Sequence, residues 1–185
     1  LSGYILDING YGFKGIGSLE EYFAYDVGYI IAPIFNAAGR LEDAKQAVSL
    51  FIEEDGFKCL SIIDKLLENN TERKDIQKKI LEMSVVEIEK KQLYNKNLIL
   101  VANKSFHHGV IGIVASKILD KYYKPTIIME IKESEGVATA SCRSIDGINI
   151  VECLNSVSDI LVKYGGHSGA AGFTIKIENI EEFYQ

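Results

Sequence analysis

The sequence predicts an α/β domain built on a mixed β-sheet that is flanked by helices and preceded by long connecting helices. Two observations predict this fold. From residue 97 onward, short β-branched runs alternate with helical segments, and between residues 57 and 93 apolar residues recur at helical spacing. Strands separated by helices of this length are typical of α/β domains with a mainly parallel or mixed sheet.

The first part of the chain contains little β pattern. "NGYGFKGIG", residues 9–17, is predicted as a loop, and residues 18–34 as a short helix that runs into an extended segment before Pro33. Apolar spacing predicts a helix over 42–54 and, after an interruption at Gly56, a second one over 57–93. We expect Asn69 and Asn70 to kink or divide this second helix near its middle.

The second part alternates strands and helices. Strands are predicted over 97–102, 125–131, 136–144 and 170–177, and helices over 109–123 and 149–164. In α/β sheets ligands gather at the loops beyond strand ends. Three such segments therefore need attention: "NKSFHHG" at 103–109, "SCRSIDG" at 141–147 and "GGHSGAAG" at 165–172.

Composition limits the function classes. The net charge of −6 argues against a nonspecific nucleic-acid binder with a broad basic surface, so any such contact must be local. Three cysteines without a CxxC spacing indicate free thiols in a reducing compartment, and no apolar run approaches a membrane span. We therefore expect a cytoplasmic protein that does not contact a membrane.

Two of these segments suit an anion. In "GGHSGAAG" the glycines and alanines leave the main-chain N–H groups around His167 accessible, as a phosphate cradle requires. In "SCRS" two hydroxyls flank Arg143, whose guanidinium can bind a phosphate through two parallel hydrogen bonds. The structural alternatives are a tight glycine turn and a surface ion pair.

Two further segments are weaker candidates. His107 and His108 open a predicted helix, where either side chain could reach an anion. They do not predict a metal site, because adjacent side chains are expected to point apart and no acidic or cysteine residue lies nearby in the sequence. Arg40 follows the small residues of "NAAGR" directly before a helix. That segment is also explained by a turn at Gly39.

Taken together, "APIFNAAGRLEDAKQAVSLF", "FHHGVIGIVASKILDKYYKPTIIM", "SCRSIDGINIVECL" and "YGGHSGAAGFTI" occur in the order seen in RecJ-type single-strand-specific exonucleases of the DHH phosphoesterase superfamily. The resemblance covers essentially the whole chain. It implies that residues 1–41 are the tail of the catalytic DHH domain, 42–96 the connecting helices, and 97–185 the DHH-associated nucleic-acid-binding domain.

The resemblance also implies roles for individual residues. Three family motifs are matched. Arg40 resembles the arginine of the NAAGR motif. Ser141, Arg143 and Ser144 resemble a Ser-Gly-Arg-Ser phosphate-binding turn, and Gly165, Gly166 and His167 resemble a GGH loop. The sequence departs from the family where Cys142 replaces a usual Gly, Phe106 replaces a usual Trp, and "SGAAG" stands where "KMAAG" is frequent. We expect Cys142 to add bulk where the chain approaches the ligand.

The chain lacks the family's Asp-His-His triplet, because "FHHG" offers Phe106 in place of the aspartate. The resemblance therefore implies that the Mn²⁺ or Mg²⁺ ions of the full-length enzyme are held by residues upstream of Leu1, that this chain contains no catalytic residue, and that it is inactive alone. It further implies a 5′→3′ exonuclease of DNA repair and recombination, with single-stranded DNA as substrate, a single-strand-binding protein or helicase as candidate partners, and a monomeric state.

Two other functions stay open at the sequence level. One is a phosphodiesterase of the same superfamily that acts on oligoribonucleotides or cyclic dinucleotides, since such enzymes also carry a GGH loop. The other is a noncatalytic binding module, like the associated domain at the end of some alanyl-tRNA synthetases. "APIFNAAGR" disfavours the module, which has no reason to retain part of a catalytic domain.

Overall fold

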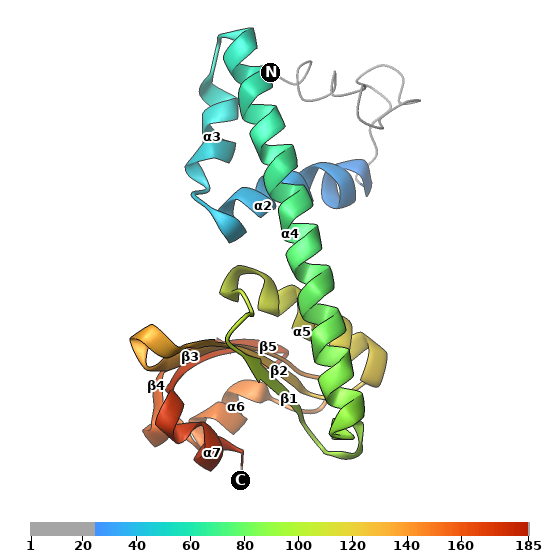
Figure 1. The fold of residues 1–185 in the computed structure, drawn as a ribbon, viewed down its shortest axis with the longest axis vertical. Helices are drawn as coiled ribbons and strands as arrows, with labels where there is room; N and C mark the ends of the chain where they lie inside the picture. The colour runs from blue at the N-terminus through green and yellow to red at the C-terminus, as the bar shows by residue number, and fades with distance from the viewer. Residues whose placement is uncertain (1–24, 185) are drawn as a thin grey trace. The chain divides into compact units, whose positions relative to one another are not determined.

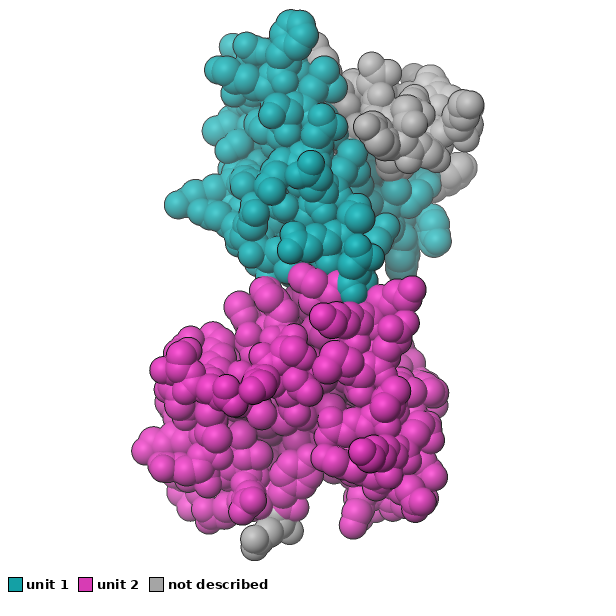
Figure 2. All heavy atoms as spheres, in the orientation of Figure 1, with its two compact units in different colours: residues 1–75 teal, residues 76–185 magenta. Residues whose placement is uncertain are grey.

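The computed structural model describes residues 25–184. The chain divides into two compact units, residues 1–75 and residues 76–185, which Figure 2 shows in different colours. None of the helices in the described residues is both long and apolar enough to cross a membrane.

The first unit is helical. A π-helical segment, η3 (Asp26–Ile31), leads directly into α2 (Ala32–Leu41), which is followed by α3 (Lys45–Ile52). The predicted extended segment before Pro33 is therefore wrong. Pro33 lies in the first turn of α2, where its fixed φ suits the helix. The predicted loop at 9–17 and the start of the predicted helix at 18–34 lie outside the described residues.

The long helix α4 (Gly56–Lys90) is unbroken, so the predicted kink at Asn69 and Asn70 is wrong. Both amides are buried and have side-chain partners. Asn70 Oδ1 accepts from Arg73 Nε at 3.2 Å and Nη2 at 3.0 Å, and Asn69 Nδ2 donates to Glu42 Oε2 at 3.3 Å. Because these bonds engage the amides, the side chains do not compete with the helical backbone.

Within the first unit, the start of α4 packs on α2 and α3 through a small apolar core. Its buried members are Ala38, Ala47, Leu50, Cys59, Ile63 and Leu66.

The second unit contains a five-stranded mixed sheet, as predicted. Its strands are β1 (Ile99–Asn103), β2 (Thr126–Lys132), β3 (Val137–Arg143), β4 (Leu161–His167) and β5 (Ala170–Lys176), in the order β1-β2-β3-β5-β4. The β1–β2 pair is parallel, since α5 (His108–Tyr122) connects these strands, and the remaining pairs are antiparallel.

Helices cover both faces of this sheet (Figure 1). On one face α5 packs on β2 and β3, and on the other lie α6 (Ile150–Asn155) and α7 (Ile180–Phe183). The core between the sheet and α6 consists mainly of aliphatic side chains together with Phe173 and Cys142. Short 3-10 segments complete the unit: η4 (Leu93–Asn95), η5 (Glu133–Glu135), η6 (Ser158–Ile160) and η7 (Ile177–Asn179).

The predicted helix over 149–164 is wrong in its second half. α6 ends at Asn155, η6 follows, and β4 begins at Leu161. Val157, Ile160 and Leu161 fit helical spacing, but the edge strand β4 is exposed along nearly its whole length and so lacks the alternation that reveals a strand. The GGH segment therefore belongs to a strand and not to a loop.

Candidate functional site

Strand register brings the candidate residues of the second unit onto one sheet face. Arg143, Ala170 and His167 form one cross-strand row over β3, β5 and β4, and Ser141, Gly172 and Gly165 form the next. A third row contains Thr139, Thr174 and Lys163. Helix α5 packs on β2 and β3 and so covers that part of the face. The part of the face over β5 and β4 is not covered by α5 and is called the open part below.

Hydrogen bonds from the guanidinium hold the Arg143 side chain against this face. Its Nε donates to Ser116 Oγ at 3.1 Å, and its Nη1 donates to Ser141 Oγ at 3.1 Å and to the Cys142 carbonyl at 2.7 Å. The side chain is only half-buried. Fixing the planar guanidinium in advance lowers the entropic cost of binding an anion through it.

A glycine on α5 leaves room for the Arg143 guanidinium on this face of the sheet. A Cβ added at Gly112 would lie 3.0 Å from Arg143 Nη2 and 3.1 Å from Ser141 Oγ. Gly112 and Ser116 are one helical turn apart on α5, so one supplies room and the other an acceptor. Sequence reasoning missed both residues, although a glycine and a serine four positions apart in an apolar helix were a visible signal.

The GGH and AAG segments form a β-hairpin with Ser168 and Gly169 at its turn. Gly166 has φ +150°, and a Cβ there would lie 2.4 Å from the Ala170 carbonyl oxygen. Two main-chain bonds fasten the turn, since Ser144 N–H donates to Gly169 O at 2.9 Å and Ile150 N–H donates to Ser168 O at 3.0 Å. The hairpin and the segment after β3 are thus one assembly.

His167 lies two strands from Arg143 in the same row. Adjacent strands are about 4.8 Å apart, so the two Cα atoms are separated by about 10 Å with only Ala170 between them. The imidazole is exposed. A guanidinium and an imidazole at this spacing, across an alanine, can approach one anion from two sides.

Two predicted positions behave differently from their neighbours. The Ser144 hydroxyl donates to Ile148 O at 2.9 Å, within its own turn, and its main-chain N–H donates to Gly169 O in the hairpin turn. Cys142 belongs to the buried core on the opposite face, where burial raises the pKa of its thiol to about 12. The expectation that Cys142 adds bulk beside the ligand is therefore wrong, because side chains alternate between faces along β3. Phe106 is also buried.

His107 and His108 lie at the beginning of α5. His107 caps the helix, with Nδ1 accepting from Gly109 N–H at 3.1 Å, and its ring stacks on His108 with centroids 4.9 Å apart. The expectation that these side chains point apart is thus wrong. Glu130 on β2 supplies a carboxylate at this helix end, since its Oε2 accepts from His108 N–H at 3.0 Å and lies 3.3 Å from His108 Nδ1.

The first unit contains Arg40, in the last turn of α2. Burial lowers the pKa of Arg73 on α4, and the charge of Arg40 adds to this effect, so the two guanidinium groups interact. Sequence reasoning missed Arg73. Its position in a solvated-looking charged run gives no sign of burial.

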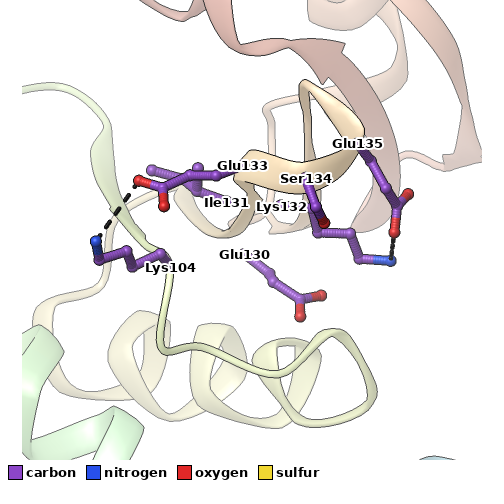
Figure 3. Close-up of a pocket in the computed structure, with 7 residues that line it drawn as sticks. All are labelled: Lys104, Glu130, Ile131, Lys132, Glu133, Ser134 and Glu135. Atoms are coloured by element: carbon purple, nitrogen blue, oxygen red, sulfur yellow. Dashed lines mark ion pairs between the residues drawn. The ribbon is translucent and has the colours of Figure 1, made fainter.

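A separate hollow of about 500 Å³ lies at the end of β2 (Figure 3). Its charged side chains pair with one another: Lys104 with Glu133 at 3.6 Å, and Lys132 with Glu135 at 3.4 Å. Together with Glu130 the lining carries more acidic than basic groups, which disfavours a phosphate ligand there.

Among residues 25–184 no three histidine, cysteine, aspartate or glutamate side chains come together as a metal-binding group. The described residues therefore do not fit the dinuclear metal site of a phosphoesterase.

Comparisons with known proteins agree on the relationships of the chain. Residues 95–185 match the DHHA1 domain family. The single-stranded-DNA-specific exonuclease RecJ of Bacillus subtilis is 38% identical over 166 residues, which are 90% of this chain and 21% of that protein. The chain thus spans about a fifth of this relative.

Two solved structures are similar over most of the chain. The crystal structure of Thermus thermophilus RecJ in complex with Mg²⁺ has a TM-score of 0.72 and 31% identity, over 87% of this chain and 24% of that one. A crystal structure of exonuclease RecJ bound to manganese has a TM-score of 0.74 and 29% identity, over 97% of this chain and 42% of that one.

Proposed function

Because the chain belongs to the RecJ-type family and carries its DHHA1 domain, we propose that it is the substrate-binding part of a single-stranded-DNA-specific 5′→3′ exonuclease. The proposed role is in cytoplasmic DNA repair and recombination. The observation that carries the proposal is the Arg143 guanidinium, fixed by Ser116 and Ser141 in one row with His167.

The proposed ligand of this row is a phosphate of the DNA strand. Arg143 supplies a permanent charge with paired donors, His167 supplies a second donor, and Ala170 between them leaves room for the anion. Such a local site is compatible with a chain of net charge −6, since affinity then depends on a few well-placed contacts. Arg40 is proposed as a further phosphate contact from the first unit.

The test is equilibrium binding of a 5′-phosphorylated, 3′-fluorescein-labelled single strand, followed by anisotropy, with duplex DNA and RNA of the same sequence as comparisons. Single-stranded DNA should bind best. The dependence on salt should be shallow, about 0.7 logarithmic units per neutralised phosphate. Equal or tighter binding of RNA would favour the oligoribonucleotide phosphodiesterase.

We expect the 185-residue chain to release no mononucleotides from labelled single strands in Mn²⁺ or Mg²⁺. The chain has no Asp-His-His triplet, and the described residues offer no metal-binding group. In the proposed full-length enzyme these ions would supply the hydrolytic chemistry. Electrophoresis of the labelled strand provides the measurement, and chelator-sensitive release by the pure chain would contradict the prediction. The chain is further proposed to be monomeric, with a single-strand-binding protein or helicase as partner.

His167→Ala is expected to weaken oligonucleotide binding more at pH 6 than at pH 8. Histidine side chains gain a proton as the pH falls through this range, and only the imidazolium adds a charge to its hydrogen bond. Anisotropy titrations at both pH values measure the difference. If His167 only orders the hairpin, the variant will instead have a lower melting temperature and a loss of affinity that is the same at both pH values.

A further inference from the structure

We propose that the open sheet face contains a second subsite, beside the Arg143–His167 row, which holds the nucleoside part of one nucleotide with Lys163 on its next phosphate. This inference rests on the proposed function, because it extends the same nucleic-acid strand by one step. The subsite is the hollow over the Gly165 row and the Lys163 row, here called the glycine hollow.

The hollow has a volume of about 300 Å³ and is lined by residues of β3, β5 and β4, namely Thr139, Ala140, Lys163, Tyr164, Gly165, Gly172, Phe173 and Thr174. This volume is at the lower end for small-molecule sites. It suits one nucleoside better than a duplex. Gly165 and Gly172 are paired across β4 and β5, so the floor at this point is bare backbone.

Two polar groups indicate that the hollow takes a ligand. Thr174 is 7% exposed and lines the hollow, so its hydroxyl offers a hydrogen-bond donor and acceptor to a ligand there. Lys163, in the same row, is exposed and brings a positive charge to the rim, which complements a phosphate.

The order of the rows then defines a path. A DNA strand with one phosphate between Arg143 and His167 would next meet the row that contains Gly165 and then the row that contains Lys163. Successive rows on one face of the sheet are two residues apart along β4. His167 and Lys163 are four residues apart along β4, so the two ends of the path are separated by about 13 Å. The small residues of the hairpin therefore provide floor for the sugar and base, while the charged side chains stand at the two ends.

The experiment compares competitors of increasing length against the labelled single strand: thymidine 5′-monophosphate, the 5′-phosphorylated dinucleotide and the tetranucleotide. The wild-type chain should bind the dinucleotide more tightly than the mononucleotide. Lys163→Gln should lose about three- to fivefold in affinity for the two longer competitors, a typical effect of one exposed charge. The affinity of this variant for the mononucleotide should equal that of the wild-type chain.

Gly165→Val fills the hollow at a position where an added Cβ meets no atom within 4 Å, so it should leave the melting temperature unchanged. It should remove the affinity gained from the second nucleotide. Lys90→Gln makes the same charge change at an exposed position on α4 and serves as the control.

The outcomes separate the two proposals. No binding of any competitor, or mononucleotide binding that survives Arg143→Ala, would contradict the proposed function. A length dependence that persists in both Lys163→Gln and Gly165→Val, or an equal loss in Lys90→Gln, would overturn the second subsite alone. If Gly165→Val fails to fold, the Lys163→Gln result still decides.

Discussion

Arg143→Ala is expected to weaken single-strand binding by about 1.5–3 kcal/mol, which is about ten- to 150-fold in the dissociation constant, at pH 6 and pH 8 alike. The guanidinium remains charged at any working pH and offers a planar pair of donors. Its hydrogen bonds to Ser116, Ser141 and the Cys142 carbonyl fix its orientation before the ligand arrives. Anisotropy titration with the 5′-phosphorylated single strand gives the affinity.

Two further variants distinguish a specific contact from general charge. Arg143→Lys should recover only part of the loss, because an ammonium group cannot reproduce the paired donors. Gly112→Ala leaves the charge in place but puts a Cβ 3.0 Å from Nη2, so it should weaken binding by displacing the guanidinium. Full recovery by Arg143→Lys together with no effect of Gly112→Ala would show that geometry at this position is unimportant.

The sequence predicted most of the sheet because most of its strands are buried. β1 and β2 contain β-branched runs on either side of helix α5, and β5 contains the buried Phe173 and Ile175. The edge strand β4 escaped prediction for the opposite reason. It is paired with β5 on one side only, its side chains are exposed, and its two glycines give no pattern of period two.

The sequence predicted the types of residue in the candidate site, but it did not predict how these residues are arranged in space. Arg143 and His167 are 24 positions apart, and the row that they share depends on the register of β3, β5 and β4. The role of Cys142 was mistaken because sequence position alone does not tell which face of a strand a side chain occupies. Ser116 was not predicted as a site residue, because its contact with Arg143 depends on the packing of α5 on β3.

Gly166→Ala is expected to destabilise the second unit by about 2–5 kcal/mol, the largest effect on stability that we predict. Its φ of +150° is a backbone conformation that residues with a Cβ rarely adopt. An added Cβ would lie 2.4 Å from the Ala170 carbonyl oxygen and 2.5 Å from the Ala171 Cα. Both obstacles are backbone atoms of the paired strand, so β4 must separate from β5 to relieve the contact.

Gly165→Ala is the matched control, because it makes the same change at the adjacent residue of the same strand. A Cβ at Gly165 meets nothing within 4 Å. Replacing a strand glycine by alanine also restricts the unfolded chain, so this variant should be as stable as wild type or up to about 1 kcal/mol more stable. Urea unfolding followed by circular dichroism measures both free energies. Equal stability of the two variants would mean that the hairpin does not require a glycine at position 166.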